Sequence, residues 1–323
     1  MNYFNPYKKK QHSRLNCWVS RQFLRVQYYW NKYILRRKII PLHTSVALSY
    51  GMVEHLNWGD DLNLFFLRKI SKDFIMPYAY SCYPNGGSLK ELKKEPLYSA
   101  IGSVLSWIPK ENTIVWGTGL IDGQLPPFDM KVYAVRGPKT REKLIEQGVD
   151  CPQVYGDPAL LLPLYYRPSS KKKKYKLGIV PHYTEYYSTK LDKFKQDPNI
   201  IVIKMFDYKH WTDIIDQICS CNMIVSSSLH GLIVSEAYSI PNFWVEIDGP
   251  IISDKSRRFK FYDFYSSIEH DDISPFQFEE KTTISDVLNM APMYKKGVYD
   301  ITGLFKACPW RLKSPLYKNV IKG

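Results

Sequence analysis

The sequence predicts an α/β protein with two Rossmann-like domains. The chain has 323 residues, roughly twice the length of a typical single domain. Hydrophobic residues make up 45% of it and charged residues 24%, which are the values of a globular rather than a disordered protein. Short apolar segments alternate with amphipathic ones on both sides of a polar stretch at residues 162–175. This alternation is typical of parallel sheets covered by helices.

The N-terminal segment, residues 1–40, is expected to be a basic amphipathic arm that forms a helix over residues 11–40. The net charge of the chain is +14, and the first 45 residues hold ten basic residues and no acidic one. Aromatic side chains such as Trp18, Tyr29 and Trp30 stand between these cations, and no proline occurs between residues 11 and 40. A helix of this kind can lie on an anionic membrane surface, here through residues 7–38.

Two other interpretations of the arm remain open. The helix can pack its aromatic side on the body of the protein and leave its basic side in water. A basic patch also suits nucleic-acid phosphates. The rest of the chain is nearly neutral and carries no nucleic-acid motif, so no nucleic-acid partner is expected.

The first α/β domain is expected over residues 41–165. Apolar, β-rich segments predict strands at residues 38–50, 98–108, 113–116 and 131–135. Apolar residues at helical spacing between positions 62 and 74 predict a helix, with Asp60 or Asp61 as its N-cap. Residues 138–147 predict a second helix, because Pro138 suits a first turn and Gly148 follows its end.

Residues 162–175 (LPLYYRPSSKKKKY) predict a linker, and a second α/β domain is expected over residues 175–285. Its strands are predicted at residues 177–181, 200–205, 223–227 and 242–246, and its helices at residues 188–196, 211–221 and 229–239. Residues 286–323 are expected to be a helical segment that packs back on the body. This outline is GT-B-like, and it predicts a ligand site in the cleft at the carboxyl ends of the strands.

Several kinds of site and location are disfavoured by what the sequence lacks. No run of 18 apolar residues could span a bilayer, and no cleavable signal is visible. The six cysteines form no CxxC pair, which favours reduced thiols in a cytoplasm. No cluster of His, Cys, Asp or Glu has the spacing of metal ligands, so no metal site is expected.

The strongest candidate for a functional site is residues 226–236 (SSSLHGLIVSE). An apolar strand ends in three serines, and Leu229, His230 and Gly231 open an apolar helix. His230 would lie in the first turn, beside backbone N–H groups and the positive end of the helix dipole, where a phosphate or carboxylate binds. The alternative is a capping serine run followed by a half-buried histidine.

Other candidate residues are less specific. Arg136, which follows a first-domain strand, is either an anion ligand or part of a surface ion pair. Asp60 in the NWGDD loop is either a general base or a helix cap. Gly119 ends a GTG sequence that lacks the third glycine of a nucleotide-binding loop. Arg258 and Lys260 precede the FYDFY segment and face either the cleft or the solvent.

Seven fragments together closely resemble the polysaccharide pyruvyl transferase family: NWGDDLN, VWGTGLI, VRGPKT, GDPALLLP, IVPHY, SSSLHGLIVSEAYSIPNFWVE and RFKFYDFY. The resemblance covers about residues 45–270 and is most specific at residues 226–246. It implies a GT-B-like fold. It also implies transfer of the pyruvyl group of phosphoenolpyruvate to a sugar of a surface-polysaccharide precursor, which gives a cyclic ketal.

The resemblance further implies which residues bind the two substrates. Basic residues, a histidine and their neighbours are expected to hold the donor: Arg136, His182, Ser228, Leu229, His230, Gly231, Arg258 and Lys260. The first domain is expected to hold the acceptor, with residues Asn57, Trp58, Gly59, Asp60, Asn63 and Gly119. Some members of the family carry Arg at the position of Ser228, so Lys260 or Arg258 must neutralise part of the donor's charge.

For the chemistry, we expect His230 to act as an imidazolium that protonates C3 of phosphoenolpyruvate, and Asp60 as the base that deprotonates the acceptor. No metal or redox cofactor is needed. Galactose, as a 4,6-ketal, is the expected acceptor. The acceptor is either a polyprenyl-diphosphate-linked oligosaccharide or a polymer, and the protein is expected to be cytoplasmic and peripheral on the inner face of the cytoplasmic membrane. Two rival functions are a GT-B-type nucleotide-sugar glycosyltransferase and a non-catalytic membrane-associated scaffold.

Overall fold

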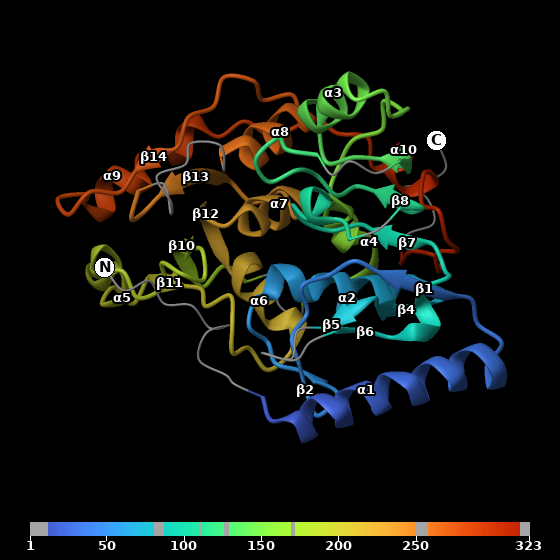
Figure 1. Ribbon diagram of the computed structural model, residues 1–323. Coiled ribbons are helices and arrows are strands. Elements are labelled where there is room, and N and C mark those ends of the chain that lie inside the picture. The colour runs from blue at the N-terminus through green and yellow to red at the C-terminus, as the bar shows by residue number, and fades with distance from the viewer. Residues whose placement is uncertain are drawn as a thin grey trace.

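The computed structural model describes residues 12–80, 87–109, 111–125, 129–168, 172–249 and 258–316. Its centre is two five-stranded sheets in which all neighbouring strands are parallel (Figure 1). The first sheet has, in spatial order, β4 (Phe74–Pro77), β1 (Ile39–Leu42), β7 (Leu97–Ser99), β8 (Thr113–Trp116) and β9 (Met130–Ala134). The second has β11 (Ile200–Val202), β10 (Tyr175–Val180), β12 (Cys221–Ser226), β13 (Asn242–Glu246) and β14 (Phe276–Gln277). The predicted α/β class with two parallel sheets is therefore confirmed.

Both sheets have the same strand order. Numbered along the chain within each sheet, the strands follow one another across it as 2-1-3-4-5, which is the order of a common doubly wound fold. The winding direction reverses beside the first strand of such a sheet. A crevice therefore opens at the carboxyl ends of β1 and β7, and another at those of β10 and β12, and ligands of doubly wound sheets bind in such crevices.

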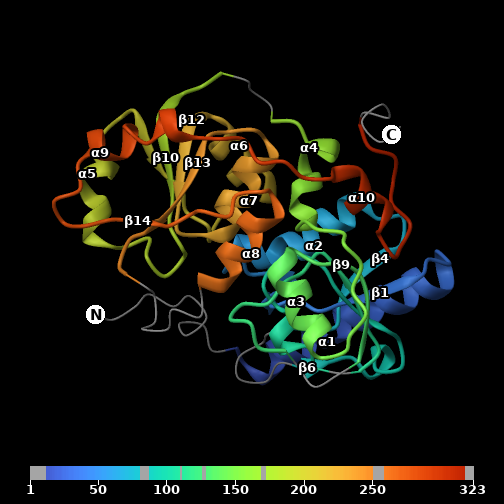
Figure 2. The same ribbon diagram turned by 90° about the horizontal axis from the view of Figure 1, so that it is seen from above.

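Helices cover the sheets (Figures 1 and 2). The longer ones are α1 (Arg14–Tyr29), α2 (Trp58–Ile70), α3 (Pro138–Glu146), α6 (Trp211–Cys219), α7 (Leu229–Ala237) and α8 (Phe259–Ser267). Shorter ones are α4 (Leu162–Tyr165), α5 (Asp192–Lys195), α9 (Ile284–Leu288) and α10 (Ile301–Lys306). A π-helical turn, Trp30–Ile34, continues α1, and short antiparallel pairs join β2 (Leu48–Ser49) to β3 (Met52–Val53) and β5 (Ala79–Tyr80) to β6 (Gly87–Ser88).

One hydrophobic core joins the two sheets. It contains side chains of β1 and β8 from the first sheet, of β10 and β12 from the second, and of α2, α4 and α7. Trp58, at the start of α2, donates from Nε1 to the Trp211 carbonyl at 2.7 Å and from its backbone N–H to the Met205 carbonyl at 2.8 Å. The first turn of α2 is thereby bonded to segments of the second half of the chain.

The C-terminal residues return from the second sheet to the first (red in Figure 2). The Trp116 indole donates to the Leu304 carbonyl at 2.9 Å, and the Tyr165 hydroxyl donates to the Lys313 carbonyl at 2.8 Å. Within the described part of this segment, a short 3₁₀ turn (Ala291–Met293) and otherwise irregular chain separate the short helices α9 and α10. It is therefore less helical than its sequence predicts.

The helix predicted to reach Phe74 ends at Ile70. Ser71 and Asp73 form a turn in which the Asp73 backbone N–H donates to Ser71 Oγ at 3.0 Å and Ser71 Oγ donates to the Asp73 carbonyl at 2.9 Å. Phe74 then begins β4. Of the strand predicted at residues 38–50, only β1 joins the sheet, because the chain leaves the sheet at the crevice; residues 48–49 form β2 of the separate hairpin. Of the strand predicted at residues 98–108, only the part within β7 is a strand.

The N-cap of α2 is Asn57, so the prediction of Asp60 or Asp61 at this position is wrong. Asn57 has an extended backbone, and its Oδ1 accepts from the Gly59 N–H at 3.2 Å. Asp60 and Asp61 lie in the first turn, where their negative charge favours the positive end of the helix dipole.

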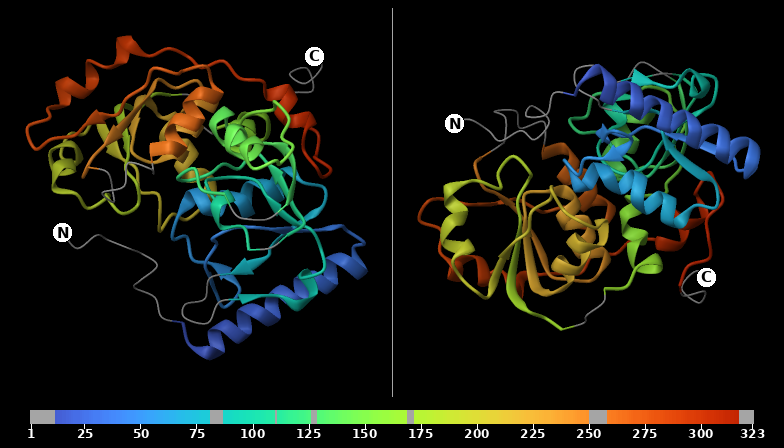
Figure 3. Two further views of the ribbon diagram at one scale, coloured as in Figure 1. Left: turned by 45° about the horizontal axis from the view of Figure 1, so that its top comes forward. Right: turned by 90° about the horizontal axis from the view of Figure 1, so that it is seen from below.

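The arm forms α1, which lies along the outer edge of the molecule (Figures 1 and 3). It begins at Arg14, where Ser13 Oγ accepts from the Asn16 N–H at 3.1 Å. Cys17, on its buried side, is disulfide-bonded, so the prediction of six reduced thiols is wrong for this residue. No helix within the described ranges has both the length and the hydrophobicity needed to cross a bilayer. Residues 7–11 of the expected membrane-facing segment lie outside the described residues.

Candidate active site

A cleft of about 610 Å³ lies where the crevices of the two sheets meet. The first sheet contributes residues that follow β1 and β7, and the second contributes residues that follow β10 and β12. The lining residues used below are Thr44, Asn57, Asp60, Ser103, Trp107, His182, Tyr183, Ser228, Leu229, His230 and Lys260. The sequence segments NWGDD, PHY, SLHG and FKF thus meet in one place, although up to about two hundred residues separate them.

The segment SSSLHG places His230 at the start of α7. Ser228 is the N-cap residue, and its extended backbone turns the chain from β12 into the helix. Gly231 lets the helix approach the sheet, because a Cβ there would lie 2.4 Å from Ser226 Oγ and 2.8 Å from a methyl group of Val180. The first backbone N–H groups of α7 and the His230 side chain therefore border the cleft together.

His230 carries an unsatisfied polar atom. Its Nε2 is buried and makes no hydrogen bond with any residue that the structure describes. Burial, and then the positive charges of Lys260 and Arg136, lower the pKa of His230 to about 3. At neutral pH the imidazole is therefore uncharged, which differs from the imidazolium predicted from the sequence. Buried polar groups normally have a partner, so an unpaired nitrogen in a cleft indicates a ligand position.

Glycines make room for this imidazole. A Cβ at Gly59, in the first turn of α2, would lie 2.2 Å from His230 Nδ1, so only glycine fits there. Gly102, after β7, has a φ of +98° and also lies beside the ring, where a Cβ would be in ordinary contact at 3.8 Å from Cε1. The glycine of the NWGDD sequence thus serves the packing of His230 and does not line the cleft.

Asp60 and Asn57 form the polar side of the cleft at the start of α2. Asn57 Nδ2 donates to Asp60 Oδ2 at 2.8 Å, while Asn57 Oδ1 caps the helix. Thr44 Oγ1, from the segment after β1, donates to the Asp60 backbone carbonyl at 3.3 Å. The Asp60 carboxylate is only half-buried, so it is held in position and remains accessible.

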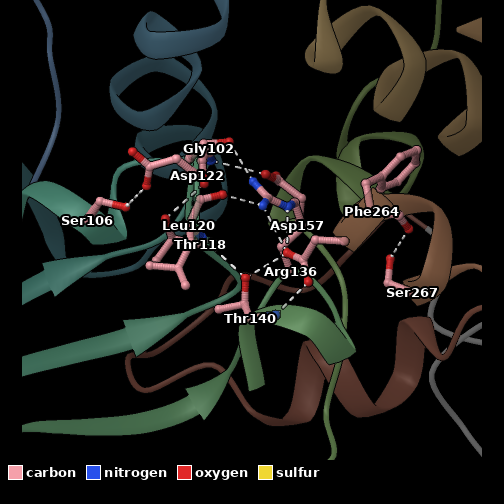
Figure 4. Close-up of polar contacts among 12 residues, drawn as sticks. Gly102, Ser106, Thr118, Leu120, Asp122, Arg136, Thr140, Asp157, Phe264 and Ser267 are labelled. Atoms are coloured by element: carbon pink, nitrogen blue, oxygen red, sulfur yellow. Dashed lines mark hydrogen bonds and ion pairs between the residues drawn. The ribbon is translucent and has the colours of Figure 1, made fainter. Parts of the chain in front are cut away.

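Arg136 does not line the cleft and lies in a buried polar network (Figure 4). It is 0% exposed. Its Nε donates to Asp263 Oδ2 at 2.9 Å, and its two terminal nitrogens donate to Ser103 Oγ at 2.5 Å and to the Leu120 carbonyl at 2.6 Å. Asp263 also accepts from Thr140. The guanidinium is therefore part of a buried ion pair, not the surface pair of the alternative interpretation, and it reaches the cleft only through Ser103.

The loop after β7 is held by buried polar contacts (Figure 4). The Gly102 N–H donates to Asp157 Oδ2 at 3.0 Å, and Thr118 Oγ1 donates to the Gly102 carbonyl at 2.9 Å. Burial raises the pKa of Asp157 to about 6. Asn63 holds the preceding residue, because its side-chain amide both donates to and accepts from the Ile101 backbone at 2.9 and 3.0 Å.

Lys260 and His182 complete the cleft on the side of the second sheet. Lys260 lies in the first turn of α8, and its Nζ is 5.1 Å from the centre of the Phe261 ring. His182 follows β10, and its Nδ1 shares a hydrogen bond of 2.7 Å with Thr184 Oγ1. The His182 backbone N–H donates to Ser227 Oγ at 2.9 Å, which ties the ends of β10 and β12 together.

Several residues expected from the sequence lie outside the cleft lining. Trp58 and Asn63 are buried and bonded to other segments, and Gly119 packs on Arg136, where a Cβ would lie 2.5 Å from Cζ. Arg258 forms a bidentate pair with Glu246, at 2.7 and 2.6 Å, and this pair raises its pKa. These residues shape the walls or lie apart from the cleft, whereas Asn57, Asp60, His182, Ser228, Leu229, His230 and Lys260 line it.

Sequence reasoning missed Trp107, Thr44, Ser103 and Tyr183, which also line the cleft. Trp107 belongs to a short 3₁₀ turn after β7 and is 55% exposed. An exposed tryptophan beside a predicted strand end is a signal that could have been used. Thr44 and Ser103 carry no such signal, since single hydroxyl residues in loops are common.

Residues 2–249 match the family model of polysaccharide pyruvyl transferase. The chain belongs to this family. The match begins at residue 2, so it includes the basic arm, which the resemblance seen in the sequence did not cover. Membership in the polysaccharide pyruvyl transferase family makes the protein a transferase of polysaccharide synthesis.

Two curated relatives are similar to this member of the family. Uncharacterized protein L143 of Acanthamoeba polyphaga mimivirus is 29% identical over 238 residues, which are 72% of this chain and 78% of the relative. Succinoglycan biosynthesis protein ExoV of Rhizobium meliloti (strain 1021) is 29% identical over 200 residues, which are 59% of this chain and 57% of ExoV.

The geometry of the cleft suits an anionic ligand. Lys260, the N-terminus of α7, an uncharged histidine and the carboxylate of Asp60 all line it. Within the described ranges, no group of three or more His, Cys, Asp or Glu residues is placed to hold a metal ion. Helix N–H groups, a cation and hydroxyls are the groups that bind phosphate and carboxylate.

Proposed function

We propose that this protein transfers the pyruvyl group of phosphoenolpyruvate to a sugar of a surface-polysaccharide precursor and forms a cyclic ketal. The observation that carries the proposal is His230 Nε2, a buried nitrogen without a described partner at the N-terminus of α7, in a cleft that also contains Lys260. Family membership supports the reaction class. The cleft between two parallel sheets also supports the GT-B-like arrangement that we propose for the fold.

The donor fits the end of the cleft beside α7. Phosphoenolpyruvate carries a phosphate and a carboxylate, and both need counter-charge and N–H donors. We assign these to Lys260, to the Ser228 hydroxyl and to the backbone N–H groups at the start of α7, with His182 at the margin. Arg136 acts as a positioning residue, because it holds Ser103 and contributes positive charge from behind the wall.

The reaction proceeds by addition, elimination and ring closure. A proton is added to C3 of phosphoenolpyruvate as an acceptor hydroxyl attacks C2, and Asp60 removes the proton of that hydroxyl. The bond between C2 and the phosphate oxygen then breaks, and inorganic phosphate leaves. A second hydroxyl of the same sugar bonds to C2 and loses its proton, which completes the ketal. His230 donates the proton to C3 after the bound donor has raised its affinity for protons.

We place the acceptor against Asp60 and Trp107, which both line the cleft. The exposed indole of Trp107 offers a flat apolar face on which a sugar ring can pack, and Asn57 fixes the carboxylate that meets its hydroxyl. We propose galactose, as a 4,6-ketal, for this sugar. We propose further that it belongs to a polyprenyl-diphosphate-linked oligosaccharide at the inner face of the cytoplasmic membrane.

The first experiment measures phosphate release from phosphoenolpyruvate by the purified protein with a panel of galactosides and N-acetylhexosaminides, and the mass of each sugar product. Acceptor-dependent release with a ketal product is the expected result. Calorimetric binding of phosphoenolpyruvate is measured in parallel. If phosphoenolpyruvate gives no heat while a nucleoside-diphosphate sugar binds, the protein is a glycosyltransferase; if neither binds, the scaffold interpretation holds.

Three variants separate the proposed roles. His230→Gln should lower turnover by ~10²–10⁴-fold, whereas His270→Gln, outside the cleft lining, should leave it unchanged. Asp60→Asn should lower turnover without weakening phosphoenolpyruvate binding.

Trp107→Ala should raise the acceptor KM and leave the donor affinity as it is. An unchanged acceptor KM in Trp107→Ala would remove the sugar platform from the proposal.

A further inference from the structure

The helix α1 exposes many of its large apolar side chains, although Cys17, Leu24 and Tyr28 of the same helix pack into a hydrophobic core. Its buried side carries the polar residues Asn16 and Ser20, which bond to the β2–β3 hairpin: Asn16 Nδ2 donates to Ser49 Oγ at 2.8 Å, and the Gly51 N–H donates to Ser20 Oγ at 2.9 Å. The outer side carries large exposed hydrophobic residues, namely Leu15, Trp18, Val26, Tyr29, Trp30, Tyr33 and Ile34. The interpretation in which the aromatic side packs on the body is therefore wrong for most of these side chains.

The exposed apolar residues lie along one side of α1, with Gln22 and Arg25 among them. Positions 15, 18, 26, 29 and 33 follow helical spacing and lie along one stripe of α1 and its π-helical continuation. Phe23 extends the surface sideways, because it packs over Gly51 at the tip of the hairpin, where Tyr50 and Met52 are also exposed. A shallow apolar groove of about 690 Å³ runs between Val26, Tyr29 and Tyr33.

Cations border the other flank of the stripe. A groove of about 510 Å³ is lined by Arg21, Arg25, Lys90 and Lys93, together with the carboxylate of Glu91. Glu91 binds Arg25 Nε at 3.0 Å, so the flank retains net positive charge. Lys90 and Lys93 belong to a separate segment of the chain, and they add cations beside the helix that its own sequence does not show.

We propose that this surface, which we call the α1 surface, docks on the headgroup region of an anionic lipid bilayer. It consists of Leu15, Trp18, Val26, Tyr29, Trp30, Tyr33, Ile34, Phe23, Tyr50 and Met52, with Arg21, Arg25, Lys90 and Lys93 at its border. Tryptophan and tyrosine favour the membrane interface, and cations attract anionic lipid. A second copy of the chain is a poor occupant, because a symmetric contact would bring the same cations together.

The inference uses none of the residues of the cleft, so it can fail while the proposed reaction stands. It extends the proposed location at the membrane, because it names the surface of the protein that contacts the lipid. Views from two sides show α1 at the outside of the molecule, with no described element covering it (Figures 1 and 3). A flat membrane can therefore reach the helix along its whole length.

The test is co-sedimentation of the full chain with vesicles made of phosphatidylcholine alone or of equal parts phosphatidylcholine and phosphatidylglycerol. We expect binding to the anionic vesicles only. The double variant Val26→Glu/Ile34→Glu should lower the partition coefficient roughly tenfold or more, because it introduces carboxylates into the apolar stripe. Its matched control is Val298→Glu/Ile145→Glu, which alters residues of similar exposure elsewhere, 61% and 46% against 66% and 62%.

A second pair of measurements tests the cations and the alternative occupants. Lys90→Glu/Lys93→Glu should also weaken binding roughly tenfold or more, and binding should fall when salt is raised from about 0.1 M to about 1 M. Equal binding to neutral and anionic vesicles, or an unchanged partition coefficient in Val26→Glu/Ile34→Glu, would overturn the proposal. So would a dimer in light scattering that this variant dissociates. Circular dichroism and turnover of a soluble acceptor confirm that each variant is folded.

Discussion

At the residue scale, three side chains set the charge balance of the cleft. His230 is uncharged at neutral pH because it is buried beside Lys260 and near Arg136. Lys260 lines the cleft, whereas Arg136 forms a buried ion pair with Asp263 within the wall. A bound anion would add the charge that favours a protonated imidazole. His230 therefore becomes the acid of the proposed reaction only when the donor binds.

The first prediction concerns this protonation. Binding of phosphoenolpyruvate should raise the pKa of His230 from about 3 toward neutrality, so the complex should take up part of one proton at slightly acidic pH. Calorimetric titrations in two buffers of different ionisation enthalpy measure this uptake. The variant His230→Gln has no titratable side chain at this position, so its proton uptake measures the contribution of the donor's own phosphate. Equal uptake by the two proteins would show that His230 stays neutral in the complex.

At the scale of the element, the first turn of α2 combines helix capping with the orientation of Asp60. Asn57 Oδ1 accepts from the Gly59 N–H, and Asn57 Nδ2 donates to Asp60 Oδ2. Trp58, in the same turn, bonds to the carbonyls of Trp211 and Met205. Within the NWGDD motif, Asp60 presents its carboxylate to the cleft, whereas Asn57 and Trp58 hold the turn in place.

The second prediction separates the two roles of Asn57. Asn57→Ala should cost about 1 kcal/mol of the free energy of unfolding through the lost cap, and it should also lower turnover. Asn57→Asp keeps a capping oxygen but places a second carboxylate beside Asp60. It should retain stability and lose kcat/KM. Thermal unfolding and steady-state kinetics on the same samples check both effects, and full activity in Asn57→Asp would show that the contact with Asp60 is dispensable.

At the scale of the whole molecule, the sheets share one core, and that core encloses ionisable groups. Burial raises the pKa of Asp61 to about 8 and of Glu185 to about 7, despite hydrogen bonds from Tyr208 and Ser227 that favour their charged forms. Burial lowers the pKa of His43 to about 4 and that of His230 to about 3. These two sets of groups make stability depend on pH in opposite directions.

The third prediction concerns stability between pH 6.5 and 8. In the folded chain both histidines are neutral throughout this window, and in the unfolded chain each is half protonated at pH 6.5 and almost fully neutral above about pH 7.5, so their opposing slope fades across the window. Asp61 binds its proton more tightly in the folded state, so its contribution is complete below the unfolded pKa of about 3.9 and is lost as the pH rises through about 8. The free energy of unfolding should therefore fall across this window.

The variant Asp61→Asn tests the assignment of this slope. The asparagine keeps an acceptor for the Tyr208 hydroxyl, which donates to Asp61 Oδ2 at 2.5 Å, and it cannot ionise. The fall in unfolding free energy between pH 6.5 and 8 should shrink by up to about 2 kcal/mol. Asp272→Asn, at an exposed position, should reproduce the original slope in chemical denaturation, and an equal slope in Asp61→Asn would assign the pH dependence to other groups.

Much of the fold follows from the sequence, because helices and strands depend on local patterns. The segment at residues 113–116 and that at residues 242–246 were predicted with the bounds of β8 and β13. Errors arose where a local polar contact ends an element. Ser71 and Asp73 end α2 through such a contact, and Asn57 rather than an aspartate begins it. The division into domains at residues 40, 165–175 and 285 stays a prediction.

The sequence by itself determined the α/β class, the family and the segments that meet at the cleft, because these depend on residue types and their spacing along the chain. Only the tertiary structure decided the roles within those segments. Arg136 is buried against Asp263, Arg258 is paired with Glu246, and α1 exposes a row of large apolar side chains. The physical reason is that charge, burial and exposure depend on neighbours from distant parts of the chain, which no local pattern specifies.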